Sequence, residues 1–318
     1  MSGLPANRTP ILVTGAHRTG TTWVGKMLAA NPRTAYISEP LNILHRPGVL
    51  STPLQHWYTY ICLQNESQYL PAFEQTLHFR YHLLAETLSL RSLKDAGRMG
   101  RDGGIFLRGW LRRQRPVLKD PFAVFSAPWF ANRLGCRVVI TVRHPAAFAS
   151  SLKRLDWPFD FSHLLAQPLL MRDWLEPYRE EMLRLSRALG GNTAGDIIAQ
   201  ASLLWRLVYQ AVAQYSEQSP QFKVVRHEDL SIEPVGGFQQ LYASLGLEFT
   251  PQVQETIQAS SSSENPQELS RRSVHAVRLD SRASLHNWKR RLTGEEIARV
   301  RKLTEETAAF FYPEIDWE

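Results

Sequence analysis

Residues 11–23, ILVTGAHRTGTTW, contain the pattern that predicts the fold of this 318-residue chain. A short and mostly β-branched run, residues 11–14, precedes a loop bounded by Gly15 and Gly20, and helical spacing follows over residues 22–30. This order of strand, loop and helix turns backbone N–H groups toward an anion, and the helix N-terminus adds partial positive charge. The stretch therefore predicts an anion-binding loop at the carboxyl end of a β-strand.

The loop resembles the phosphate-binding pattern G-x-x-x-x-G-K-[ST] of nucleoside triphosphatases, with one departure. Gly15, Gly20 and Thr22 fit the pattern, but Thr21 stands where the lysine would be. A kinase also needs an Asp at the end of a neighbouring strand for Mg²⁺, and the strongest later strand ends in Arg143 instead. The loop is therefore expected to hold a single 5′-phosphate region without a metal. The alternative is an ordinary turn whose threonines cap a helix.

Further short strands are expected at residues 36–37, 116–119, 137–142 and 222–225, with helices at 122–134, after 145, and at 164–190, 194–217, 233–245 and 295–311. Residues 54–96 have helical character, and 97–104 form a Gly/Arg-rich stretch that predicts a loop. Strands that alternate with helices predict an α/β fold, here a P-loop-NTPase-like parallel sheet flanked by helices. No repeat or linker is visible, so residues 1–318 are expected to form one domain, with helical insertions at 41–115 and 156–217 around an acceptor site.

Composition narrows the class of protein. An apolar fraction of 43% supplies a sizeable core, and neither a leader-like segment nor an apolar run of about 18 residues is present. We therefore expect a cytoplasmic protein without a transmembrane segment. The two cysteines, Cys62 and Cys136, are too few for a disulfide framework or a cysteine metal cluster. A net charge of +7 attracts anions, without distinguishing nucleic acid from a phosphorylated cofactor or an acidic glycan.

The segment RTGTTW, residues 18–23, resembles the 5′-phosphosulfate loop of sulfotransferases that use 3′-phosphoadenosine 5′-phosphosulfate (PAPS). The usual form in that family is K-S-G-T-T-W, so Arg18 stands for its lysine and Thr19 for its serine. A second signature of the family, an arginine that ends a strand and a serine eight residues later, matches Arg143 and Ser151. The resemblance implies that these two residues bind the 3′-phosphate. It also implies that the loop binds the cofactor through Arg18, Thr19, Gly20, Thr21, Thr22 and Trp23.

Two downstream segments extend the resemblance. In VVRHEDL, residues 224–230, His227 occupies the position of a family tyrosine that touches the adenine, and a buried structural histidine is the alternative. NWK, residues 287–289, is similar to the D-W-K of the family. Upstream of this segment the family often has R-K-G on the 3′-phosphate, where this chain has Ser281-Arg282-Ala283, offset by one residue. Arg282, Lys289 and Arg290 are therefore candidates for the 3′-phosphate. A solvated basic helix start is the alternative for this segment.

The resemblance implies transfer of a sulfuryl group from PAPS to an acceptor hydroxyl, leaving adenosine 3′,5′-bisphosphate (PAP). Arg18 would stabilise the charge that develops on the leaving group, and Lys119 the transferring group. The segment Ser38-Glu39-Pro40 resembles the arrangement in family members whose base is a glutamate after the second strand, so Glu39 is the predicted general base. Asp120 is the second candidate base and His17 the third, and an ion-paired structural role is the alternative for Glu39.

The acceptor is predicted to be a small molecule or a glycan, with a carbohydrate or glycolipid hydroxyl favoured. The unassigned segments carry aromatic residues and arginines that suit such an acceptor: Trp57, Tyr58, Tyr60, Tyr69, Arg108, Arg112, Arg113 and Arg115. The rival functions are a P-loop kinase and a non-catalytic nucleic-acid or polyanion binder, and we expect no nucleic-acid partner. The polar segment 259–275 is predicted to move as a lid over the cofactor.

Overall fold

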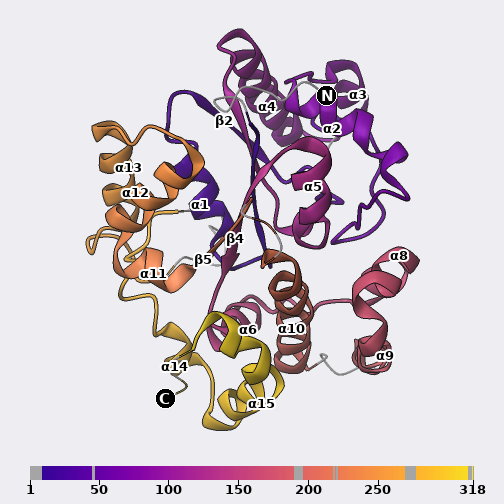
Figure 1. The fold of residues 1–318 in the computed structure, drawn as a ribbon, viewed down its shortest axis with the longest axis vertical. Coiled ribbons are helices and arrows are strands. Elements are labelled where there is room, and N and C mark those ends of the chain that lie inside the picture. The colour runs from indigo at the N-terminus through magenta and orange to yellow at the C-terminus, as the bar shows by residue number, and fades with distance from the viewer. Residues whose placement is uncertain are drawn as a thin grey trace.

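The computed structural model describes residues 9–44, 47–189, 196–217, 219, 221–268, 277–313 and 317. Its centre is a sheet of five parallel strands in the order β2-β3-β1-β4-β5 (Figure 1). The strands are β1 (Ile11–Gly15), β2 (Thr34–Ser38), β3 (Arg115–Lys119), β4 (Arg137–Val142) and β5 (Phe222–Arg226). All five strands expected from the sequence are therefore present, and the predicted α/β fold is confirmed.

Helices cover both faces of this sheet. The helices are α1 (Thr21–Leu28), α2 (Leu70–Leu77), α3 (Leu83–Ser89), α4 (Leu93–Leu111), α5 (Ala127–Leu134), α6 (Pro145–Leu155), α7 (Ser162–Leu165), α8 (Pro168–Leu170), α9 (Arg179–Leu189), α10 (Ile197–Ser216), α11 (His227–Ile232), α12 (Pro234–Leu245), α13 (Pro251–Ser261), α14 (Asn287–Arg291) and α15 (Gly294–Phe311). Helices α1, α12 and α13 cover one face, and α5 and α10 lie on the other (Figure 1). Because both faces are covered, β1, β3 and most of β4 are buried, which explains their apolar runs.

Each face has its own apolar core. Val13, Trp23 and Phe238 belong to the core between the sheet and α1, α12 and α13. Leu12, Phe130 and Trp205 belong to the larger core on the opposite face. Alternate residues of β1 thus point into different cores, so this strand anchors the loop that follows it from both sides.

Three sequence expectations on secondary structure were wrong. Residues 97–104, expected as a loop, lie inside α4. The helix expected over 164–190 is broken into α7, α8, a π-turn at Met171–Leu175, a 3₁₀ turn at Glu176–Tyr178, and α9. Helix α13 was not predicted, and it includes residues 259–261 of the expected lid, whereas residues 269–275 of that lid lie outside the described residues.

In the described part of the chain, no helix is both long enough and apolar enough to cross a bilayer.

Candidate functional site

The loop between β1 and α1 is shaped by two glycines. Gly15 has φ 140° and Gly20 has φ 97°, a region that favours glycine. A Cβ atom on Gly15 would lie 2.4 Å from the Thr141 carbonyl oxygen, and one on Gly20 would lie 2.7 Å from His227 Nδ1. The loop therefore packs so closely against β4 and the start of α11 that neither position has room for a side chain.

Hydroxyl groups inside the loop fix its shape. Thr19 is fully buried, and its Oγ1 donates to the Ala16 carbonyl at 2.6 Å and lies 2.8 Å from Thr141 Oγ1. Tyr209 donates to the Thr141 carbonyl at 2.7 Å, which joins α10 to the same network. Gly20 precedes α1 without a side-chain acceptor for the first N–H groups of that helix. The helix therefore starts with uncapped donors in a rigid setting, an arrangement that attracts an anion.

Arg18, Arg143 and Ser151 come together beside this helix start. Arg18 Nε donates to Ser151 Oγ at 3.3 Å, and an Arg143 Nη atom donates to the Arg18 carbonyl at 3.2 Å. Burial, followed by the charges of Arg143 and Arg154, lowers the pKa of Arg18 to about 10, and burial also lowers the pKa of Arg143. These guanidinium groups repel one another in a desolvated place, so an anion between them would stabilise all of them.

The sequence reasoning missed two further arginines at this cluster. The first is Arg154, which lies one helical turn after Ser151 on α6. The second is Arg291, the last residue of α14, whose pKa is lowered by burial and by the charges of Arg154 and Arg143. Glu268 holds both, with Oε1 at 3.4 Å from Arg154 Nε and 2.8 Å from an Arg291 Nη atom. The i,i+3 spacing from Ser151 and the basic run at 289–291 are the sequence signals that could have indicated them.

Arg282 and Lys289 occupy less central positions. Arg282 is exposed, and its Nε donates to the Ile232 carbonyl at the end of α11 at 2.8 Å. Lys289 Nζ lies 5.4 Å from the ring centroid of Trp288. Trp288 in turn stacks on His144, with ring centroids 4.9 Å apart. Lys289 is thus linked through two rings to the residue after Arg143, and the binding roles of Arg282 and Lys289 stay predictions.

His227 and Trp23 lie side by side behind the loop. Burial, and then the charge of Arg143, lower the pKa of His227 to about 3, so its imidazole is neutral at pH 7. Trp23 is 8% exposed, donates from Nε1 to Ser260 Oγ at 2.9 Å, and packs edge-to-face on His227 and Phe238. Trp23 is therefore a core residue beneath the loop, and its role in cofactor binding stays a prediction.

Two buried donor or acceptor atoms at this site have no hydrogen-bond partner among the described residues. They are Arg143 Nε and His227 Nδ1. Buried polar atoms are normally paired, because leaving one unpaired costs about 1–3 kcal/mol. The simplest explanation is a polar ligand that supplies the missing partners.

Glu39 and Lys119 form a second part of the site, at the carboxyl ends of β2 and β3. The backbone N–H of Glu39 donates to the Lys119 carbonyl at 2.7 Å, and Lys119 Nζ forms an ion pair with Glu39 Oε1. Asn42 donates to the other carboxylate oxygen of Glu39 at 2.8 Å. The Lys119 side chain is 2% exposed and packs against Gly25 of α1, whereas that of Glu39 is 19% exposed. Of the two, Glu39 is the one that solvent or an acceptor can reach.

The other two candidate bases are engaged in structural contacts. Asp120 accepts from the N–H groups of Phe122 at 3.0 Å and Leu41, and burial raises its pKa to about 7. His17 lies with Nδ1 2.7 Å from the Tyr58 hydroxyl, and burial, with the charge of Arg18, lowers its pKa to about 4. The charge of Glu39 raises the pKa of His17, so Glu39 lies close enough to the loop for their charges to interact.

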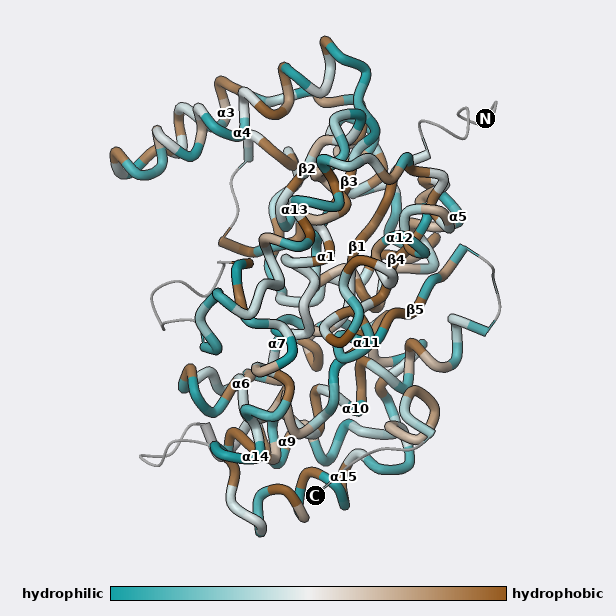
Figure 2. The backbone as a smooth tube through the Cα atoms, turned by 90° about the vertical axis from the view of Figure 1, so that its left-hand side faces the viewer, coloured by the Kyte–Doolittle hydropathy of each residue, from teal (hydrophilic) through white to brown (hydrophobic). Residues whose placement is uncertain are grey.

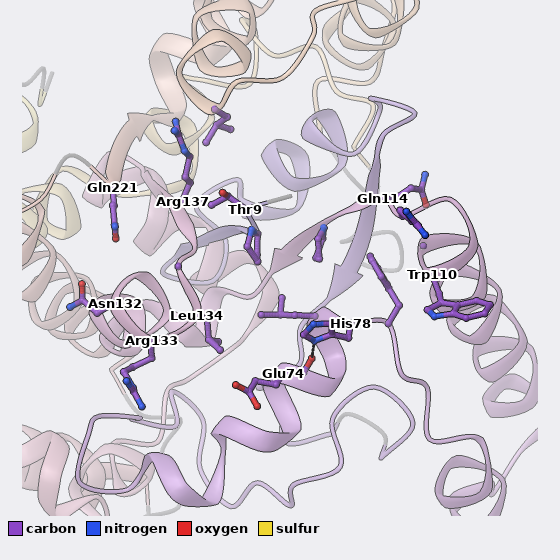
Figure 3. A pocket seen from close by; sticks show the side chains of 18 of the residues that line it. Thr9, Glu74, His78, Trp110, Gln114, Asn132, Arg133, Leu134, Arg137 and Gln221 are labelled. Atoms are coloured by element: carbon purple, nitrogen blue, oxygen red, sulfur yellow. Dashed lines mark hydrogen bonds between the residues drawn. The ribbon is translucent and has the colours of Figure 1, made fainter. Parts of the chain in front are cut away.

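A hollow of about 1250 Å³ lies at the amino ends of the strands, on the far side of the sheet from the loop (Figure 3). Its lining includes residues at the amino ends of the strands, among them Pro10, Pro116, Arg137 and Lys223. Arg115, which the sequence suggested for the acceptor site, begins β3 at this edge and donates to the Leu245 carbonyl at 2.6 Å. The hollow is therefore separate from the loop, and Arg115 does not lie beside Lys119.

The fold and the site define a class of protein: an α/β protein with a glycine-bounded loop and clustered arginines at the carboxyl ends of a parallel sheet. A family model described as "Sulfotransferase family" matches residues 10–192, more than half of the chain. The chain belongs to this family of transferases.

None of the curated proteins compared with the chain matches it. Several solved structures are similar in fold. A sulfotransferase domain from the curacin biosynthetic pathway is 15% identical, covering 96% of this chain and 99% of that one with a TM-score of 0.48. A sulfotransferase domain of the Synechococcus PCC 7002 olefin synthase is 16% identical, covering 99% of both chains with a TM-score of 0.47. A mouse sulfotransferase complexed with PAP is 12% identical, covering 94% of this chain and 84% of that one with a TM-score of 0.42.

Proposed function

We propose that this protein transfers a sulfuryl group from PAPS to an acceptor hydroxyl. One observation carries the proposal: Arg18, Arg143 and Ser151 converge at the uncapped start of α1, and Arg143 Nε and His227 Nδ1 are buried there without a hydrogen-bond partner among the described residues. A nucleotide with two anionic groups would satisfy the Arg143 donor and the uncapped N–H groups of α1. The loop N–H groups and Arg18 would hold the 5′-phosphate, and Arg143 with Ser151 the 3′-phosphate.

The chain's residues would act on charge that develops during the reaction. PAPS supplies a sulfuryl group that passes to the acceptor oxygen as the bond between sulfur and the 5′-phosphate oxygen breaks. Arg18, with a pKa of about 10, stays protonated at neutral pH and would stabilise the negative charge left on that phosphate. An arginine does not give up its proton at this pH, so its contribution is electrostatic.

Glu39 is the base we propose for the acceptor proton. It is partly exposed at the carboxyl end of β2, and the ion pair with Lys119 and the hydrogen bond from Asn42 hold its carboxylate in one orientation. Asp120 has both oxygens bonded to backbone N–H groups, and His17 is hydrogen-bonded to Tyr58. Neither is as well placed to take a proton. Lys119 would orient Glu39 and stabilise the transferring group.

A carbohydrate or glycolipid hydroxyl is the acceptor that the surrounding side chains suit best. Trp157 is 41% exposed and lies 5.8 Å from the Arg18 guanidinium carbon, and half-buried Trp57 packs on Phe122 beside His17. The exposed aromatic face of Trp157 beside the Arg18 cation fits the apolar face and hydroxyls of a sugar ring. Both tryptophans lie in the insertions 41–115 and 156–217, which we propose form the acceptor side of a single domain.

Thermal unfolding with PAP, 5′-AMP and ATP plus Mg²⁺ tests the proposal. At about 100 times its dissociation constant a ligand adds about 2.7 kcal/mol to the unfolding free energy, so PAP should raise the melting temperature visibly and 5′-AMP should raise it less. Arg143→Ala should abolish the effect of PAP, whereas Arg301→Ala, on the exposed side of α15, should leave it intact. Stabilisation by ATP plus Mg²⁺ alone would favour a kinase and reject the proposal.

A further inference from the structure

Helices α3 and α4 lie at one end of the molecule (Figure 2), where α4 packs against β2 on one side. We call residues 83–113 the α3–α4 arm. The most exposed large apolar side chains of the described residues lie on it: Leu93 is 93% exposed, Leu88 89% and Leu84 82%. Leu83, Leu107, Trp110 and Leu111 on the same arm are each more than half exposed. Scattered exposed leucines are ordinary, but such a concentration marks an interaction surface.

The three exposed leucines of α4 form one strip. At 100° per residue, Leu93, Leu107 and Leu111 fall on one side of the helix, together with the glycines at 97, 100 and 104. A Cβ atom added at any of these three glycines would meet no atom within 4 Å, so nothing among the described residues covers this side. The buried residues Phe106 and Gly109 lie on the opposite side and anchor the helix to the protein.

A basic strip runs beside the apolar strip. The same helical geometry places Lys94, Arg101 and Arg108 next to the leucines, with Arg112 directly after the helix. The α3–α4 arm has seven lysines and arginines and three carboxylates. Of these carboxylates, Glu86 is buried and Asp95 and Asp102 are paired with Arg98 and Arg101. Within the described ranges, no carboxylate forms an ion pair with Lys94, Arg108 or Arg112.

We propose that the α3–α4 arm binds the surface of an anionic lipid bilayer. A strip of leucines beside a row of cations allows a helix to lie in the plane of a membrane, with its apolar side in the acyl boundary and its cations at the lipid phosphates. A second copy of the chain fits less well, because two α3–α4 arms facing each other would bring two excesses of positive charge together. This inference does not depend on the proposed sulfuryl transfer.

Vesicle sedimentation with the full chain tests the proposal. The protein should pellet with vesicles of phosphatidylcholine and phosphatidylglycerol at 7:3, bind at least tenfold more weakly to pure phosphatidylcholine, and dissociate in 0.5 M salt. Leu88→Ser/Leu93→Ser should weaken binding at least tenfold, whereas Leu63→Ser, which is 70% exposed outside the α3–α4 arm, should not. Lys94→Gln/Arg108→Gln should weaken it by about 25-fold, at about fivefold per charge. Lys223→Gln/Lys302→Gln serves as the charge control.

Far-ultraviolet circular dichroism and the melting temperature should be unchanged in every variant, because the substituted side chains are exposed. Equal binding to both kinds of vesicle, or no binding to either, would overturn the proposal. A lipid-free dimer in light scattering that Leu88→Ser/Leu93→Ser dissociates would also overturn it, and would identify the α3–α4 arm as a contact between copies of the chain.

Discussion

Two of the residues proposed to act in the reaction have unusual backbone conformations. Arg18 has φ 70° and Glu39 has φ 49°, in the left-handed region that costs a non-glycine residue about 1–2 kcal/mol. The surrounding contacts hold both in place: Arg143 donates to the Arg18 carbonyl, and the Glu39 N–H donates to the Lys119 carbonyl. Strain of this kind concentrates at functional sites, which supports a role for both residues.

The ion pair between Glu39 and Lys119 allows the structural and catalytic roles of Glu39 to be separated. Glu39→Gln should lower the unfolding free energy by about 3 kcal/mol, because Lys119 would remain charged and buried without a partner. Glu39→Gln/Lys119→Met should regain most of that loss, since no buried charge is left. Both variants should still bind PAP but release it from PAPS at least 100-fold more slowly than wild type. Urea unfolding and a PAP-release assay measure the two effects.

Recovery of turnover together with stability in the double variant would contradict both the role of Glu39 as base and the role of Lys119 at the transferring group. A structural role alone would tie activity to folding, whereas a proton acceptor cannot be replaced by an amide.

Helix α4 demonstrates how an element can contradict its local sequence. Five glycines lie within its 19 residues, and each costs roughly 1 kcal/mol relative to alanine in a helix interior. The loop prediction for 97–104 followed this propensity. Burial of Phe106 against the rings of Phe79 and Tyr81, and the cap from Ser92 to the Asp95 N–H, stabilise the helix instead.

The glycines of α4 differ in what surrounds them, which yields a matched pair of variants. Gly100→Ala should raise the unfolding free energy by about 0.5–1 kcal/mol, because a Cβ atom there meets nothing within 4 Å and alanine favours the helix. Gly109→Ala should lower it, because the new Cβ atom would lie 2.6 Å from the Phe79 ring. Equilibrium urea unfolding of both variants checks the prediction, and a destabilised Gly100→Ala would mean that the helix is not formed in solution.

At the scale of the whole molecule, two buried neutral histidines make stability depend on pH. Burial lowers the pKa of His17 to about 4 and that of His227 to about 3, below the value of 6.5 expected in the unfolded chain. As the pH falls from 6.5 to 4, the unfolded state binds protons that the folded state does not. Each histidine therefore lowers the unfolding free energy by up to about 1.4 kcal/mol per pH unit.

Asp120 acts in the opposite direction. Its pKa is raised to about 7, so as the pH falls the folded state binds this proton before the unfolded state does, which favours the folded state. With two groups against one, stability should fall on acidification across this range. His227→Asn should make the unfolding free energy fall less steeply with decreasing pH, by up to about 1.4 kcal/mol per pH unit, because one fewer proton is bound on unfolding. Urea unfolding at pH 4.5, 5.5 and 6.5 measures the slope, and equal slopes for wild type and variant would show that His227 titrates normally in the folded protein.

The sequence alone determined the parts of this protein that depend on short stretches of chain. Five strands and the glycine-bounded loop of residues 15–20 follow from local periodicity and spacing, because strands and tight turns have fixed geometry. Arg143 and Ser151 were singled out by the resemblance to the family motif, and in the structure both contact Arg18. Glu39 was singled out because Ser38-Glu39-Pro40 resembles the arrangement in family members with a glutamate base, and its ion pair with Lys119 follows from the parallel register of β2 and β3.

Only the tertiary structure decided which distant segments meet. Arg154 and Arg291 approach Arg143 from α6 and α14, Arg115 faces the opposite edge of the sheet, and α4 is helical despite its glycines. The pKa of each buried group depends on every charge and apolar neighbour that the fold places around it. Such neighbours can be far apart in the sequence, as Tyr209 is from the loop at Ala16, 193 positions away, so no local pattern could have predicted them.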